Sequence, residues 1–160
     1  MMIALSSCAA NPAEQVDIRQ YFGKSRAELI EMLGEPTGPD RVPLGMSDDP
    51  DTLVYVKSMQ QEEKRLPATF ERLLLKISSK GYCYEVSGST VGFDSPEAML
   101  NALGVGGLSR QVTKTTKLGP DYEMPPFESV QIRRQWDKDP SYTRFIFGDR
   151  DAIHGPVEAQ

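Results

Sequence analysis

The sequence has 160 residues, of which 39% are hydrophobic, and this is enough for a folded unit of ordinary size. It carries 18 Lys and Arg against 23 Asp and Glu, and the net charge of −5 argues against nucleic-acid binding through a basic face. No stretch approaches the roughly 20 apolar residues that a transmembrane helix needs. Two cysteines and one histidine exclude a four-cysteine zinc site and a histidine-rich metal site, so no metal or cofactor is expected.

The N-terminal segment contains an apolar residue and two small residues before a cysteine, in the run Leu5-Ser6-Ser7-Cys8. This run resembles the lipobox of bacterial lipoproteins, which implies cleavage before Cys8 and lipid, palmitate included, on that residue. Residues 1–7 lack the basic region and the apolar length of a signal peptide, about 7–15 residues. They are therefore interpreted as a truncated signal-peptide remnant, and residues 8–20 as the lipid anchor and a polar tether.

The first half of the chain predicts one helix followed by three strands. The helix begins with a capping box, Ser25-Arg26-Ala27-Glu28, and ends at Gly34, just before Pro36. The β-branched and aromatic run 53–56 predicts a strand, and residues 72–77 and 82–86 alternate between apolar and polar side chains. The loop 78–81 contains a glycine, so the last two strands are expected to form a hairpin.

The second half predicts a similar order. Asp94-Ser95-Pro96-Glu97 is typical of a helix start, and Gly104 of a helix end. Strands are expected within residues 108–118, 130–136 and 142–147. We therefore predict an α+β fold with helices packed on an antiparallel sheet, in units 21–90 and 91–148 followed by a flexible tail, 149–160. Either two tandem α-β-β-β units or one continuous domain would satisfy the pattern.

The run from Phe22 to Pro36 resembles the SmpA/OmlA family of small outer-membrane assembly lipoproteins. The resemblance includes a glycine, a capping serine, a short helix and Leu33-Gly34-Glu35-Pro36, and it extends to about residue 87. It departs from the family where a Trp-Tyr pair before the strand appears as Leu53-Val54-Tyr55, and residues 88–160 have no counterpart in a single-domain member. Tandem copies of such a fold occur in secreted β-lactamase-inhibitor proteins.

No catalytic or metal-binding group is expected. His154 lies in a Gly- and Pro-containing tail, and Cys83 lies on a strand, where a buried structural thiol is expected. The acidic run that contains Asp48, Asp49 and Asp51 lacks the ligand spacing of a calcium loop and predicts a solvated turn. The run 104–107 follows a helix, which does not fit a dinucleotide-binding loop.

Two surface regions are candidates for binding. A basic patch is predicted from three cations with no acid between them: Arg110, Lys114 and Lys117. A protein interface is predicted from arginine and aromatic residues, which are enriched at such surfaces: Tyr122, Phe127, Arg133, Arg134 and Trp136. Trp136 is also interpreted as a core residue, and the aromatic and acidic run 121–127 as a loop that projects from the sheet.

Together these features predict a non-enzymatic bacterial envelope lipoprotein anchored to the outer membrane through Cys8 and facing the periplasm. It would act as a scaffold or assembly factor by binding other envelope proteins, with no small-molecule substrate. A secreted or periplasmic enzyme inhibitor built from two such units, in which the run 121–127 reaches the enzyme, is one alternative. A soluble adaptor or structural subunit without lipid is another.

Overall fold

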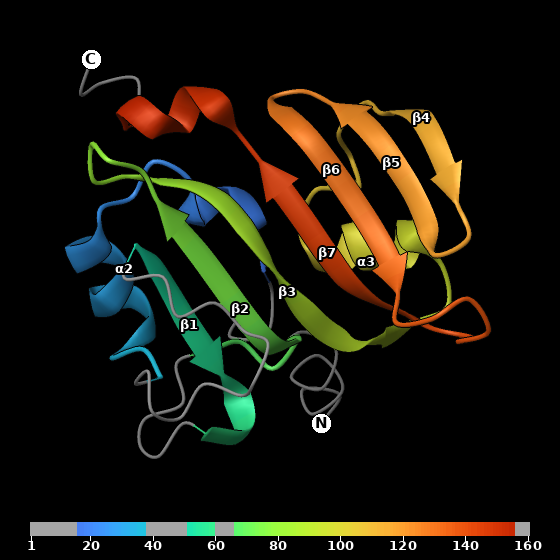
Figure 1. Ribbon diagram of the computed structural model, residues 1–160, viewed down its shortest axis with the longest axis horizontal. Helices are drawn as coiled ribbons and strands as arrows, with labels where there is room; N and C mark the ends of the chain where they lie inside the picture. Colours follow the sequence, from blue (N-terminus) through green and yellow to red (C-terminus); the bar gives the residue numbers. More distant parts are fainter. Residues whose placement is uncertain (1–15, 38–50, 60–65, 156–160) are drawn as a thin grey trace, which may run out of the picture.

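A seven-stranded antiparallel sheet dominates the computed structural model, which describes residues 16–37, 51–59 and 66–155 (Figure 1). The two α-helices of this part of the chain lie on one side of the sheet, which confirms the predicted α+β class. The strands are β1 (Thr52–Val56), β2 (Phe70–Ile77), β3 (Cys83–Phe93), β4 (Gln111–Thr116), β5 (Gly119–Met124), β6 (Phe127–Arg134) and β7 (Tyr142–Gly148). The helices are α2 (Arg26–Leu33) and α3 (Pro96–Ala102), with the 3-10 helices η2 (Ile18–Tyr21), η4 (Lys57–Met59) and η5 (Arg150–His154).

Both α-helices begin at the serines that the sequence indicates. The Ser25 hydroxyl accepts the Glu28 N–H at 3.2 Å and donates to the Glu28 carboxylate, also at 3.2 Å. Ser95 accepts the Ala98 N–H at 3.1 Å and precedes Pro96 in the first turn. At the other end of α2, Gly34 adopts φ 83°, which L-residues with a side chain rarely adopt. Local hydrogen bonding therefore explains both helix starts, and glycine the end of α2.

The strands are arranged in the order β1-β2-β3-β7-β6-β5-β4. The last strand of the chain thus lies between the two halves and pairs with β3 on one side and β6 on the other. On β3, Val86 lies opposite Phe147, and Gly88 lies opposite Phe145. The two halves therefore share one sheet.

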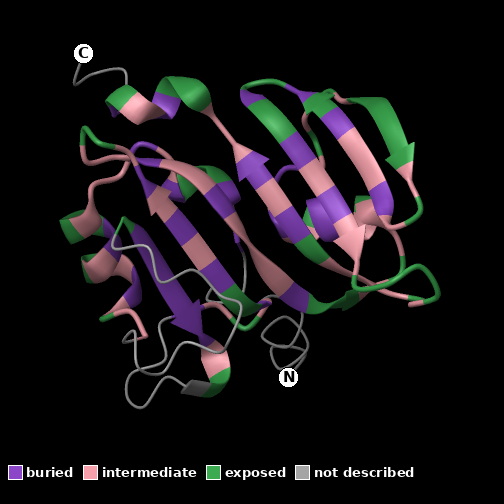
Figure 2. Cartoon of the chain, in the orientation of Figure 1, coloured by how far each residue is buried: buried purple, intermediate pink, exposed green. Residues whose placement is uncertain are grey.

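The core lies between the sheet and the helices, and buried residues alternate with more exposed ones along the central strands (Figure 2). Its centre is aromatic. The ring centroid of Phe145 lies 5.8 Å from that of Phe70 and 6.0 Å from that of Phe147. The ring centroids of Phe127 and Phe147 are 5.0 Å apart. Such separations fall within the range at which tilted aromatic pairs attract one another. One continuous aromatic cluster therefore joins β2, β7 and β6.

Strands β2 and β6 have closely similar sequences and burial. Each begins with Phe-Glu, and on each the first, fourth and sixth residues are buried: Phe70, Leu73 and Leu75 on β2, and Phe127, Val130 and Ile132 on β6. The second half contains four strands after its helix, so it is larger than the predicted α-β-β-β unit. The similarity supports an internal duplication, which stays a prediction.

The run 121–127 is not a projecting loop. Residues 119–124 form β5, residue 127 begins β6, and only Pro125 and Pro126 connect them. The sequence of β5, Gly-Pro-Asp-Tyr-Glu-Met, begins with residues typical of turns, although the segment pairs as a strand with its sequence neighbours β4 and β6. The prediction of a loop here was wrong.

Two further expectations differ from the structure. Trp136 lies beyond the end of β6 and is 58% exposed, so its interpretation as a core residue was wrong. Residues 149–155, predicted as part of a flexible tail, contain η5 and pack against the β2–β3 turn. There Ser78 Oγ donates to the Ile153 carbonyl at 2.9 Å, and the Asp149 N–H donates to the Tyr84 carbonyl at 2.9 Å.

The two edges of the sheet differ. At the β1 edge, Thr37 donates its N–H to the Val54 carbonyl at 2.8 Å, and its hydroxyl oxygen accepts the Val56 N–H at 3.1 Å. At the opposite edge β4 is exposed over most of its length, and no strand of the described part of the chain pairs with its outer side. One edge is therefore partly occupied and the other is open.

Replacing Phe145 by alanine is expected to lower the free energy of unfolding by about 3–5 kcal/mol, because it opens a cavity at the centre of the aromatic cluster. Urea denaturation measured by circular dichroism would give the change. The matched control is Val91→Ala on β3, where the side chain is 46% exposed and little change is expected. Equal effects of the two substitutions would contradict this account of the core.

Candidate functional site

One face of the sheet points away from the helices, and we call its central part the open face. It consists of outward-pointing side chains of β2, β3, β7 and β6, assigned from strand register: Arg72, Leu74, Lys76, Glu85, Ser87, Ser89, Arg144, Ile146, Ser129, Gln131 and Arg133. None of these residues belongs to the buried core cluster. The open face is therefore a mixed polar surface, formed by strands from both halves of the chain.

Three arginines lie in one row across the open face. Arg72 on β2 lies opposite Ser89 on β3, Ser89 lies opposite Arg144 on β7, and Arg144 lies opposite Arg133 on β6. Like charges directly opposite one another on neighbouring strands are destabilising. The row therefore places an arginine on three of four adjacent strands, and the direct opposition of Arg144 and Arg133 is unfavourable for stability.

Arg133 is neutralised within the fold. Its guanidinium forms an ion pair with Asp121, and its Nη1 also donates to the carbonyls of Gly119 at 3.2 Å and Pro120 at 2.8 Å. The Arg133 side chain is only 18% exposed. These contacts hold the start of β5 against β6, so Arg133 has a structural role.

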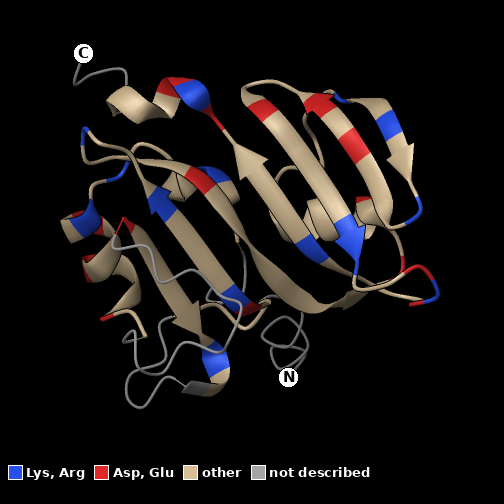
Figure 3. Ribbon diagram, in the orientation of Figure 1, with Lys and Arg blue, Asp and Glu red and all other residues tan. Residues whose placement is uncertain are grey.

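Arg72 and Arg144 have no such partners. Both are exposed, and neither side chain forms an ion pair or a hydrogen bond within the described part of the chain. The neighbouring row of the open face contains no acid and consists of Leu74, Ser87, Ile146 and Gln131. In the row beyond it, Glu85 is already paired with Lys76 at 3.3 Å. In Figure 3, Lys and Arg positions lie on β2 and β7, the strands on either side of β3. Within the described part of the chain, the two arginines thus have no ion-pair partner.

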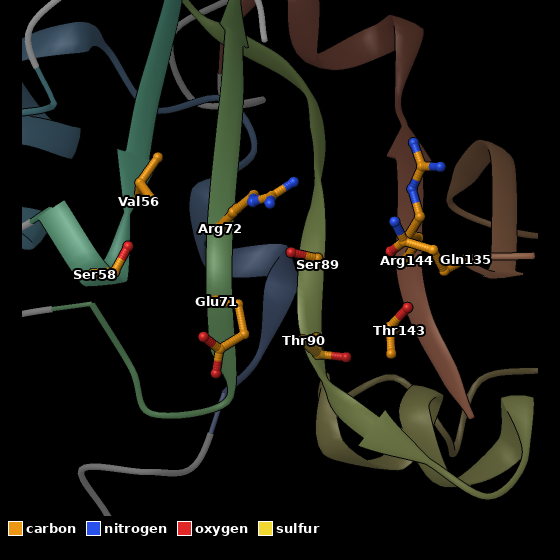
Figure 4. A pocket seen from close by; sticks show the side chains of 9 residues that line it. All are labelled: Val56, Ser58, Glu71, Arg72, Ser89, Thr90, Gln135, Thr143 and Arg144. Atoms are coloured by element: carbon orange, nitrogen blue, oxygen red, sulfur yellow. The ribbon is translucent and has the colours of Figure 1, made fainter. Parts of the chain in front are cut away.

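Two hollows lie on either side of the line from Arg72 through Ser89 to Arg144. The first, a cavity of about 530 Å³, is lined by these three residues and by hydroxyl and amide side chains, with Glu71 as its acid. Figure 4 shows Arg72 extending toward β3 beside Ser89, and Arg144 running along β7. The second hollow, about 430 Å³, adds Leu74, Ile146 and Arg133 and is lined by no acidic residue.

Short side chains on β3 produce these hollows. Its central residues are Ser87, Gly88, Ser89 and Thr90, whereas the flanking strands carry arginine and larger aliphatic residues. Gly88 has a backbone reason to lack a side chain, because a Cβ there would lie 2.2 Å from the Arg72 carbonyl oxygen. A shallow trough therefore runs along β3 between β2 and β7.

Two of the predicted interface residues are buried. Tyr122 and Phe127 are each 5% exposed and belong to the core cluster, so their prediction as contact residues for a partner was wrong. The Tyr122 hydroxyl contacts the Glu97 carboxylate at 3.2 Å, and burial, reinforced by that carboxylate, raises the pKa of Tyr122 to about 12. Phe127 packs against Phe22 and Phe147.

Arg133, Arg134 and Trp136 do not form one cluster of free side chains. Arg133 is paired with Asp121, and Arg134 lies over the ring of Tyr142, 5.1 Å from its centroid, where cation–π attraction operates. Trp136 is exposed in the β6–β7 connection and stays a candidate contact residue.

The predicted basic patch is spread along β4. Arg110 and Lys117 flank the strand, so about seven residues of extended chain, roughly 20 Å, separate them. The Arg110 guanidinium lies 6.0 Å from the centroid of the Tyr122 ring and donates to the Gly106 carbonyl, whereas Lys114 lies opposite Asp121. The three cations therefore do not form a compact site.

The remaining candidate residues give no catalytic arrangement. Cys83 is fully buried, as expected, and burial raises the pKa of its thiol to about 12. His154 is exposed at the end of η5. Over residues 16–37, 51–59 and 66–155, no group of three or more His, Cys, Asp and Glu could hold a metal ion. Cys8, Asp48 and Asp49 lie outside the described residues.

Comparison with known proteins identifies no relative of this chain. No family model matches the chain, and searches of curated proteins and of solved structures find no significant match. No described helix is long and apolar enough to cross a membrane. The resemblance to the SmpA/OmlA family and the lipoprotein interpretation therefore stay predictions.

The sequence pointed to neither Arg72 nor Arg144 as a site residue. Alternation along β2 does place Arg72 opposite to Leu73, so its outward direction could be inferred. That Arg144 lies two strands away follows only from the pairing of β7 with β3.

The different roles of the arginines can be measured through stability. Arg133→Gln is expected to lower the free energy of unfolding by about 1–3 kcal/mol, because it leaves the Asp121 carboxylate and two carbonyls without their donor. Arg144→Gln removes the same charge but also removes the like charge opposite Arg133, so the change should stay within about 0.5 kcal/mol. Urea denaturation would compare them. A larger loss for Arg144→Gln than for Arg133→Gln would contradict these assignments.

Proposed function

We propose that this chain is a non-enzymatic bacterial envelope lipoprotein that acts as a scaffold or assembly factor by binding another protein through the open face. The observation that carries the proposal is the pair of exposed arginines, Arg72 and Arg144, which have no ion-pair partner within the described part of the chain. Local arrangements that cost stability without a structural return are expected at functional sites. Arg133, by contrast, is used by the fold itself.

The composition of the open face also supports binding to a protein. Charged side chains alternate with small and aliphatic ones, and the trough along β3 gives the surface relief. Interfaces of non-obligate complexes combine apolar contact with polar and charged groups in this manner. The buried thiol of Cys83 and the exposed His154 do not form a comparable surface for binding.

Membrane attachment is the second part of the proposal. It rests on the lipobox-like run Leu5-Ser6-Ser7-Cys8. The predicted tether, residues 9–20, extended too far, because Val16 and Ile18 are buried in the core and η2 begins at Ile18. The proposed tether is therefore residues 9–15. More than one acyl chain is needed for stable anchoring, so we propose a fully acylated Cys8 that holds the protein at the periplasmic side of the outer membrane.

One alternative has a specific observation in its favour. The two halves share a single sheet, which is the surface that an enzyme inhibitor built from two units would present. The projecting loop on which this alternative also depended is the β5–β6 hairpin instead. Identification of the partner as an enzyme whose activity falls on binding would establish the inhibitor.

The open face can be tested by photo-crosslinking in the native envelope. A photoreactive amino acid at Ser87, on β3, is expected to give an adduct of defined mass with a partner protein, because this residue lies in the trough. The matched control is the same amino acid at Ala27, exposed on α2 away from the open face. Equal adducts from both positions, or none from Ser87, would contradict the proposal.

Lipid attachment can be tested by intact mass. Protein purified from its native membrane is expected to begin at Cys8 and to carry the added mass of the acyl chains, whereas Cys8→Ser is expected to lack it. An unmodified chain that retains Met1 in the soluble fraction would contradict the lipoprotein and favour the soluble adaptor.

A further inference from the structure

The open face has features that define the chemistry of its partner more closely. Resting on the proposed function, we infer that the partner contributes an extended acidic segment, which lies along β3 and places a carboxylate between Arg72 and Arg144. The second hollow is its binding site.

Charge complementarity is the first argument. Arg72 and Arg144 stand on either side of Ser89, two strand spacings or about 10 Å apart at the backbone. Guanidinium groups bind carboxylates through paired, charge-assisted hydrogen bonds, which are stronger than those between neutral groups. Both arginines are free of protein carboxylates in the described part of the chain, so both can contribute to one acid.

The two hollows differ in the charges of the residues that line them, and this difference indicates which hollow would bind an anion. Glu71 lines the first hollow and would repel an anion there. The second hollow is lined by Arg72, Arg144 and Arg133, and its lining contains no acidic residue. Asp121 compensates Arg133 alone. An acidic side chain is therefore expected on the side of the arginine row that Leu74 and Ile146 also line.

The neighbouring row favours a peptide over a small free anion. Leu74 lies opposite Ser87, and Ser87 lies opposite Ile146, so two aliphatic side chains flank the trough just beyond the arginines. The arginine row and this aliphatic row lie two residues apart along each strand. This is the spacing of successive side chains on one face of an extended chain. A partner segment with an acidic and an apolar residue two positions apart would contact both rows.

The test uses the full chain and two labelled peptides. The probe has the repeat Glu-Ser-Leu-Ser, and the control replaces each Glu by Gln. Backbone NMR titration is expected to show binding of the acidic peptide, with the largest shifts at residues 87–89 and 144–146. The Arg72→Gln, Arg144→Gln double variant is expected to bind about tenfold more weakly, and added salt should also weaken binding. Arg150→Gln, which removes an exposed arginine on η5, is expected to bind normally.

Several outcomes would overturn the inference. Equal binding of the two peptides, an unchanged affinity in the double variant, or shifts that map to β4 or α2 would each do so. Inorganic phosphate is a further probe: saturation at residues 87–89 by phosphate, without binding of the acidic peptide, would reassign the hollow to a small anion.

The crosslinking experiment separates this inference from the proposed function. If the adduct at Ser87 persists in the Arg72→Gln, Arg144→Gln variant, the open face binds a partner through other chemistry and the acidic segment is wrong. If no adduct forms at Ser87 in the unaltered protein, the proposed function itself fails. Loss of the adduct in the double variant but not in Arg150→Gln supports both.

Discussion

The pairing of β3 with β7 is the interaction on which the rest of the structure depends. It brings the last strand, β7, back to the centre of the sheet. There β7 joins β3 of the first half to β6 of the second. The aromatic cluster crosses the same joint, because Phe145 on β7 contacts Phe70 on β2 and Phe147 contacts Phe127 on β6. Such long-range pairing costs loop entropy, which burial of these large rings offsets.

The open face depends on that joint as well. Arg72 belongs to the first half of the chain and Arg144 to the last strand, and only the shared neighbour β3 places them together. Core and surface are coupled here, since alternate residues of β7 contribute rings to one face and Arg144 and Ile146 to the other. A partner bound across the row would contact both halves, and its binding energy would add to the stability of the joint.

Much of the fold could be predicted from local sequence. Ser25 and Ser95 mark the helix starts because capping hydrogen bonds form within three residues, and alternation reveals β2 and β7 because each has one buried face. The strand β5 was not predicted because its first residues resemble a turn. Trp136 was wrongly assigned to the core because the alternating pattern was extended beyond the end of β6.

The candidate site could not be predicted in the same way. Its two free arginines are separated by most of the second half of the chain, and nothing near either one reveals the other. Their proximity is a property of strand register, which is set by non-local pairing. The aromatic residues Tyr122 and Phe127, prominent in the sequence as contact candidates, are instead buried in the core cluster.

The unequal edges of the sheet limit how copies of the chain could assemble. A sheet with two free edges can add copies at both ends and grow into a fibre, as in uncontrolled β-aggregation. Here Thr37 occupies backbone groups of Val54 and Val56 at the β1 edge, whereas the outer side of β4 is open in the described part of the chain. Pairing through β4 would join two copies about a two-fold axis and leave the two partly occupied β1 edges outside. Further edge-to-edge growth would then have to displace Thr37 from Val54 and Val56.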